Sequence, residues 1–360
     1  MICAILFLSF LAQAGSAQSE LSPEAVQHLQ AGIAAEKAQQ LETAIAEFRK
    51  ATELEPNAAI GYVRLGEAYM SNHAYAEAVT PLRRALELDP ELPAAHLLLG
   101  YAQLAQGYAA DAIPHLDKIH ELGGLGIAQI QTGQISEAVS NLQAAVKQRP
   151  NDPDLLYYLS QASELLAQQS ADALLANFPD SDRAHQRRGQ NYFALHQAAQ
   201  AEQEYQRALT LRPDLPGLHM ELGQVYAESA QWSKAEEQYR MEAKLQPGNA
   251  QVAYRLGDAL LQEGHVKESL RELQLSNDLQ PDMPETLYSL GKAASATGDA
   301  EIAEKSWTRV IALEKESPLA AQAHFGLAGL YRKQGKATEA AAEMWEFRKL
   351  QERNGHAKTD

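Results

Sequence analysis

The chain has 360 residues, of which 45% are apolar, so it has enough apolar side chains to fold and is not wholly disordered. Its formal charge of −16 argues against nucleic acid as a partner, because phosphate binding depends on Lys and Arg. The single cysteine, Cys3, lies at the extreme N-terminus, which excludes disulfides, thiolate metal sites and a cysteine nucleophile from the rest of the chain.

Residues 1–17 have the pattern of a secretory signal peptide. An almost unbroken apolar run from Ile2 to Leu11 is followed by small and polar residues, with candidate cleavage sites after Ala14 and Ala17. The run is too short to span a bilayer. No Lys or Arg precedes it, so a buried first helix or a start codon placed too late stays open as an alternative. A cleaved signal peptide predicts a periplasmic or secreted protein without a lipidated cysteine.

From residue 22 onward the chain is dominated by a repeat of 34 residues. When the repeated glycine is counted as position 8, position 20 is mostly alanine, position 24 is bulky and position 32 is often proline. The signature residues are Gly32, Gly66, Gly100, Gly126, Gly189, Gly223, Gly257, Gly291, Ala44, Ala78, Ala201, Ala235, Pro56, Pro90, Pro213, Pro247 and Pro281.

These positions have a physical logic that predicts pairs of helices. Positions 4, 7, 8 and 11 share one face of a first helix, and positions 20, 24 and 27 share one face of a second. Small residues at positions 8 and 20 let the paired helices approach closely, and the large residue at position 24 fills the space beside them. Proline at position 32 ends the second helix.

The repeats occur in two regular blocks, at residues 22–124 (three repeats) and 182–352 (five repeats). Residues 125–181 form two irregular units between them, because Gly126 follows Gly100 by only 26 residues. Residues 153–181 are expected to be a degenerate unit with a short second helix before Pro179. A bend in one solenoid is favoured over a boundary between sub-domains, because no Ser/Gly/Pro-rich linker separates the blocks.

The tail at residues 353–360 is too short to form a further covering helix. The last helix carries Met344, Trp345, Phe347 and Leu350, so apolar surface is expected to stay uncovered there. Such a surface predicts a homotypic or partner contact through the C-terminal helix.

The cleanest repeat, Leu65-Gly66-Glu-Ala-Tyr69 followed by Ala78, Leu82 and Pro90, closely resembles the tetratricopeptide repeat family. The resemblance covers residues 22–352 and, with the signal peptide, indicates a bacterial periplasmic or secreted type. It implies an all-α fold, an α-solenoid of about ten helix–turn–helix repeats, which binds other proteins.

In that family the first helices line a concave groove, with positions 2, 5, 9, 12 and 13 facing the partner. The candidate partner-binding residues at these positions are Val63, Met70, Leu97, Tyr101, Leu104, Gln190, Phe193, Met220, Gln224, Tyr254, Asp258, Tyr288, Lys292, Phe325 and Arg332. Packing between neighbouring first helices is the alternative role for Val63 and Leu97. The aromatic residues Tyr254, Tyr288 and Phe325 recur at one groove position in three successive repeats.

Catalysis is not expected. The sequence has no phosphate-binding glycine loop, nucleophile elbow or tuned carboxylate pair, and no stretch of about 100 residues lies outside the repeats. No cofactor is predicted. No metal site is predicted either, because histidines with ligand spacing on one helix are absent. Five histidines occupy position 4, where the family usually has a semi-buried aromatic residue, and are expected to pack: His28, His96, His185, His219 and His324.

The favoured function is an adaptor that holds components of an envelope, secretion or export assembly. A periplasmic chaperone-like holder of extended client segments is the second hypothesis, supported by the apolar residues of the first block. A cytoplasmic adaptor with a misplaced N-terminus is the third.

Overall fold

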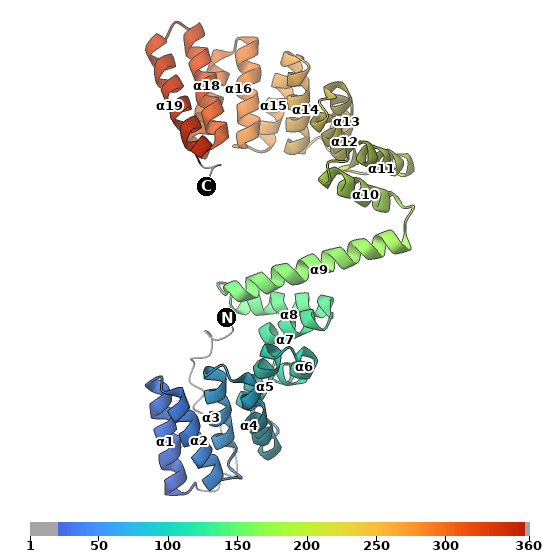
Figure 1. The fold of residues 1–360 in the computed structure, drawn as a ribbon. Coiled ribbons are helices and arrows are strands. Elements are labelled where there is room, and N and C mark those ends of the chain that lie inside the picture. Colours follow the sequence, from blue (N-terminus) through green and yellow to red (C-terminus); the bar gives the residue numbers. More distant parts are fainter. Residues whose placement is uncertain (1–20, 357–360) are drawn as a thin grey trace. The chain divides into compact units, whose positions relative to one another are not determined.

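The computed structural model describes residues 21–356, so the predicted signal peptide at residues 1–17 lies outside the described residues. Within this range the chain is all-α (Figure 1). Two compact units divide it, the first ending at Ser170 and the second beginning at Ala171, both within one helix.

Unit 1 is built of antiparallel helix pairs, each a first helix followed by a second helix. Its helices are α1 (Pro23–Lys37), α2 (Leu41–Leu54), α3 (Ala59–Ser71), α4 (Tyr75–Leu88), α5 (Pro93–Ala105), α6 (Ala109–Lys118), α7 (Leu122–Gln131), α8 (Ile135–Gln148) and the beginning of α9 (Pro153–Asn177).

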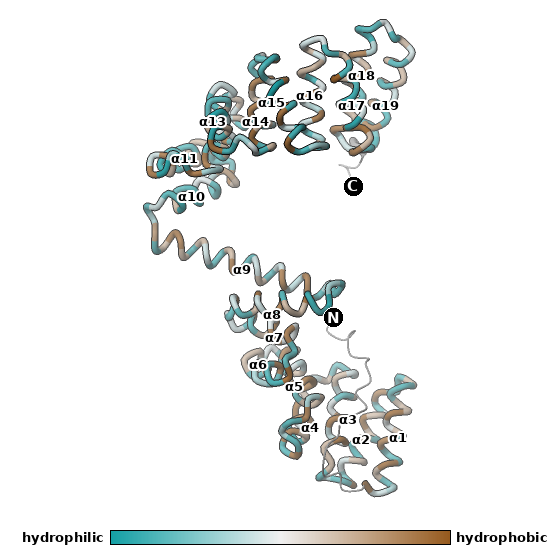
Figure 2. The backbone as a smooth tube through the Cα atoms, turned by 180° about the vertical axis from the view of Figure 1, so that it is seen from behind, coloured by the Kyte–Doolittle hydropathy of each residue, from teal (hydrophilic) through white to brown (hydrophobic). Residues whose placement is uncertain are grey.

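Unit 2 repeats the same plan through five further pairs. Its helices are α10 (Asp182–Ala194), α11 (Ala198–Leu211), α12 (Leu218–Glu228), α13 (Trp232–Leu245), α14 (Ala250–Gln262), α15 (Val266–Leu279), α16 (Pro284–Thr297), α17 (Ala300–Glu314), α18 (Pro318–Lys333) and α19 (Ala337–His356). Apolar and polar stretches alternate along the helices, as expected where one side of each helix is buried (Figure 2).

The fifth repeat differs from the sequence prediction. Residues 153–181 do not form a helix pair, because α9 continues from Pro153 to Asn177 without a turn. The stretch from Leu166 to Ser170, where a turn would lie, contains no Gly or Pro to interrupt the helix. Of the α9 side chains, only Leu155 and Ala162 are buried. The described residues therefore hold nine helix pairs and one single helix, instead of ten pairs.

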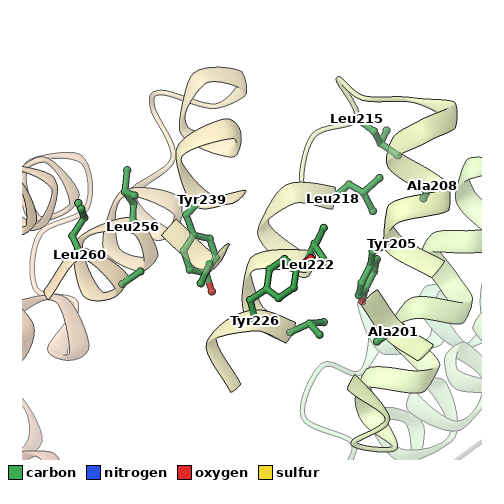
Figure 3. Close-up of a cluster of buried hydrophobic side chains, with 13 residues drawn as sticks. Ala201, Tyr205, Ala208, Leu215, Leu218, Leu222, Tyr226, Tyr239, Leu256 and Leu260 are labelled. Carbon is green, nitrogen blue, oxygen red and sulfur yellow. The ribbon is translucent and has the colours of Figure 1, made fainter. Parts of the chain in front are cut away.

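The close contact between paired helices occurs where the repeat glycines predict it. A Cβ atom placed on Gly66 would lie 2.5 Å from the Leu82 side chain, and one on Gly223 would lie 2.5 Å from the Tyr239 ring. Each of these two contacts joins position 8 of a repeat to position 24 of the same repeat. In unit 2, Tyr205 and Tyr239 fill this space at the centre of a buried cluster (Figure 3).

The turn inside every described pair places position 15 in the left-handed region, with φ between 54° and 89°. The residue after it donates its N–H to the carbonyl of position 11, which closes the first helix with a 6→1 hydrogen bond. The nine residues at position 15 are Gln39, His73, Gly107, Gly133, His196, Ala230, Gly264, Gly298 and Gly335.

The histidines at position 4 pack as predicted, but they also form a hydrogen bond that the sequence analysis did not foresee. In each of the five repeats, Nδ1 of the histidine lies 2.6–2.9 Å from a polar atom 19 residues later, on the second helix. The partners are Glu47, His115, Glu204, Gln238 and Glu343. This position therefore joins the two helices of a pair by a polar bridge as well as by packing.

Candidate partner-binding surfaces

The first helices of each unit lie against one another as well as against their second helices. In unit 1, α3 contacts α5 and α5 contacts α7; in unit 2, α14 contacts α16 and α16 contacts α18. Among the described residues, no contacts of similar extent join consecutive second helices. The first helices therefore approach one another more closely, which marks the inner side of each solenoid. We call these surfaces the first-helix face of unit 1 and the first-helix face of unit 2.

On the first-helix face of unit 1, the structure separates the predicted residues into two groups. Val63 and Leu104 are only 6% and 5% exposed and belong to the hydrophobic core, so they offer little area to a partner. Met70, Leu97 and Tyr101 are half-buried. The Tyr101 hydroxyl donates a hydrogen bond of 2.9 Å to Glu121. The apolar strip expected here is thus smaller than the sequence predicted.

Glu36 is a feature of this face that the sequence analysis missed. It lies at position 12 of the first repeat, one of the partner-facing positions, but the prediction there gave weight to apolar residues. Burial and the negative charge of Glu67 raise the pKa of Glu36 to about 7, against a smaller opposing effect of Arg64. Its Oε1 atom is buried and, among the described residues, has no hydrogen-bond partner. Unit 1 therefore holds a carboxyl group that titrates near neutral pH.

Glu36→Gln is expected to stabilise unit 1 above pH 7 by about 1–3 kcal/mol. A raised pKa means that the folded state favours the protonated carboxyl. The contribution of the protonated Glu36 carboxyl to the free energy of unfolding is complete below pH 4.5, and it is lost as the pH rises through about 7. The glutamine variant stays neutral, so its advantage should appear between these values and level off above them. Urea denaturation across pH 4–8 measures this, with Glu53→Gln as a control at an exposed site. A constant difference at every pH would contradict the assignment.

The first-helix face of unit 2 is crossed by hydrogen bonds between successive first helices. Gln190 of α10 donates to Glu221 of α12 at 2.8 Å, and Gln186 donates to both oxygens of Glu221 at 3.2 Å. Ser289 of α16 donates to Asp258 of α14 at 3.3 Å. Burial raises the pKa of Glu221. Gln190 and Asp258 therefore hold neighbouring helices in register, in addition to any role towards a partner.

The three aromatic residues of this face have different environments. Phe325 is 55% exposed, with its ring 5.2 Å from that of Phe347. Tyr254 and Tyr288 are half-buried at the edges of two hydrophobic clusters. The Lys292 ammonium lies 5.7 Å from the Tyr288 ring centroid.

The remaining predicted residues of unit 2 lie on the same face. Phe193, Met220 and Gln224 are half-buried, and Phe193 packs against the cluster shown in Figure 3. Arg332 is exposed near the end of α18. Lys292 on α16 and Arg332 on α18 place positive charge at the C-terminal end of the face. The acidic residues Glu221 and Asp258 lie on the preceding first helices, α12 and α14.

Comparison with known proteins agrees with this architecture. Residues 124–166, 220–284 and 288–345 match a family model described as tetratricopeptide repeat. Residues 71–107 match a model described as TPR repeat, and residues 28–58 and 182–215 match a further tetratricopeptide repeat model. No curated protein matches the chain.

Several solved structures are similar to parts or most of the chain at low identity. MamA (41-end) from Desulfovibrio magneticus RS-1 has 18% identity and a TM-score of 0.45, covering 48% of this chain and 96% of its own. The APC/C hetero-tetramer Cut9–Hcn1 has 13% identity and a TM-score of 0.43, covering 91% and 87%. Yeast Tom70 has 14% identity and a TM-score of 0.38, covering 91% and 92%.

Two observations lead to one assignment: helix pairs are closed by a large residue at position 24 packed against the small residue at position 8, and family models match in both units. The chain belongs to the tetratricopeptide repeat proteins, a family of protein–protein interaction scaffolds.

Proposed function

We propose that this scaffold binds an extended or helical segment of a partner protein on the first-helix face of unit 2. The observation that supports this most is the row of Tyr254, Tyr288 and Phe325 on three successive first helices. The last two of these helices also carry the cations Lys292 and Arg332. A few residues carry most of the binding energy of a protein interface, and Tyr, Trp and Arg are enriched among them. A partner segment with apolar anchors and an acidic end would complement this face.

Changing Tyr254, Tyr288 and Phe325 together to alanine is expected to abolish partner capture while leaving the helical content unchanged. A matched control changes Leu195, Leu211 and Met241, which are exposed apolar residues of unit 2 away from these positions. Crosslinking pulldowns from an envelope fraction measure partner capture by each variant. Circular dichroism measures the helical content of each variant. Loss of capture in the control alone, or melting of the aromatic variant, would contradict the proposal.

The cellular setting is a further part of the proposal. The apolar N-terminal segment favours an adaptor in a bacterial envelope, secretion or export assembly. No helix among the described residues is long and apolar enough to cross a membrane. N-terminal sequencing of the purified protein separates this setting from a cytoplasmic adaptor, which would retain residues 1–17.

A chaperone-like holder of extended client segments is the alternative, and the pulldown distinguishes it from an adaptor. An adaptor should yield one or a few discrete crosslinked partners, whereas a holder should yield many. The reduced apolar surface of unit 1, with Val63 and Leu104 buried, favours the adaptor.

The C-terminal helix keeps its proposed role as a contact surface, but with less apolar area than the sequence predicted. Leu350 is buried against Ala320 and Ala321, and Phe347 is half-buried, whereas Trp345 is 60% exposed. Light scattering at high protein concentration tests the homotypic form, which a monomer would contradict.

A further inference from the structure

Three potential metal ligands, one from a helix and two from a single turn, meet at the junction of the pair α12–α13 with the pair α14–α15. Glu236 lies on α13, Glu263 follows the end of α14, and His265 precedes α15. One ligand atom from each residue lies within 4.8 Å of the other two. His265 Nδ1 is 3.3 Å from Glu236 Oε2 and 3.9 Å from Glu263 Oε2. The single imidazole nitrogen thus faces two carboxylates.

The surroundings orient these groups towards one another. The Glu236 side chain is only 9% exposed, and its other oxygen, Oε1, accepts an ion pair from Arg240. Arg240 also pairs with Glu268 at 3.1 Å, which fixes its own position. Oriented ligands of this kind, held by a hydrogen-bonding partner behind them, are typical of metal sites.

The turn between α14 and α15 brings the other two ligands to the same place. Gly264 separates them and has a φ of +83°, so the chain reverses and both side chains can approach Glu236. The Glu263 side chain is 19% exposed, while the His265 side chain is 53% exposed. An ion at this point can therefore be reached from solvent and can retain water ligands.

The other repeats show that this combination is not required by the fold. Glu263 and His265 occupy positions 14 and 16 of their repeat, and Glu236 occupies position 21 of the repeat before it. The equivalent residues at three other junctions are Asn72, Ala74 and Ile45; Gln106, Tyr108 and Val79; and Thr297, Asp299 and Leu270. Those junctions form the same turn without three ligands, so the cluster serves something other than the turn itself.

We propose that Glu236, Glu263 and His265 bind a divalent transition-metal ion of the Zn²⁺ class. One imidazole nitrogen and two carboxylate oxygens are suitable ligands for Zn²⁺, and water completes the coordination. Metal–ligand bonds of about 2.0–2.2 Å require the three side chains to close in slightly, which the exposed imidazole permits. The bound ion ties α13 to the turn that precedes α15. The site is separate from the first-helix face, so it does not depend on the proposed function.

Calorimetric titration of the full chain with Zn²⁺ tests the site. The wild-type chain is expected to bind one Zn²⁺ ion, and His265→Ala and Glu263→Gln should each weaken binding at least about 10-fold. His196→Ala is the matched control, since this exposed histidine also lies in a turn of unit 2, and it should bind like the wild type. Co²⁺ added in place of Zn²⁺ should give an absorption spectrum that both ligand variants lose.

The outcomes separate a metal site from a hydrogen-bonded cluster. Circular dichroism in the presence of EDTA shows that each variant is folded before the titration. If the wild type binds no Zn²⁺, the three residues form only a structural hydrogen-bonded group. If both ligand variants bind Zn²⁺ as tightly as the wild type, the ion binds elsewhere. Either result overturns the proposal.

Discussion

Replacing Glu242 by alanine is expected to lower the free energy of unfolding of unit 2 by about 2–4 kcal/mol. The Glu242 side chain on α13 is fully buried and reaches the N-terminus of α12. Its Oε1 accepts the Gly217 N–H at 2.7 Å, and its Oε2 accepts the Met220 N–H at 3.3 Å. Gly217 has no side chain to cap the helix itself, so the carboxylate of a neighbouring helix takes that role. Alanine would leave these two part-buried backbone donors without partners.

Glu242→Gln serves as the control for Glu242→Ala. Glutamine keeps one acceptor oxygen and the side-chain volume but loses the charge, so its effect should be about half as large. Urea denaturation measures both variants, and amide hydrogen exchange should place the loss of protection at the first turn of α12. Equal stability of the alanine variant and the wild type would show that water replaces the carboxylate.

Gly223→Ala and Gly329→Ala are expected to change stability in opposite directions. Both glycines lie within first helices, but a Cβ on Gly223 would lie 2.5–3.0 Å from three atoms of the Tyr239 ring. This overpacking should destabilise unit 2 by about 1–3 kcal/mol. A Cβ on Gly329 would meet no atom within 4 Å. There the better helix propensity of alanine should stabilise unit 2 by about 0.5–1 kcal/mol.

Because the two substitutions are chemically identical, their difference isolates the contact at position 8. Thermal unfolding gives the comparison, with about 2–4 °C of Tm for each kcal/mol in a unit of this size. Stabilisation by both substitutions would mean that the helices of the α12–α13 pair can move apart without cost.

The scaffold was predictable from the sequence because its requirements are local. A glycine at position 8 and a large residue at position 24 must touch in every pair, so both recur at a fixed spacing. The fifth repeat was predicted wrongly as a helix pair because its apolar residues keep the repeat spacing. No residue between Leu166 and Ser170 interrupts a helix, however, and α9 is continuous.

The candidate sites were less predictable. The same helical spacing describes residues that pack between first helices and residues that face a partner, so Val63 could not be distinguished from Leu97 by position alone. The environment of Glu36 depends on burial and on the charge of Glu67, which its own position does not reveal. Glu236 lies on α13 and Glu263 and His265 lie in the turn before α15, so ligand spacing along one helix could not reveal them.

The arrangement of contacts along the chain has a consequence for folding. Among the described residues, all extensive contacts join helices that are one or two apart in the sequence. Few long loops must therefore close before a pair gains stability, and such chains fold rapidly. Each new pair can dock on the one before it as the chain emerges N-terminus first. Unit 1 can thus reach its native packing before the last helices of unit 2 have emerged, which shortens the time that apolar helix faces are exposed to aggregation.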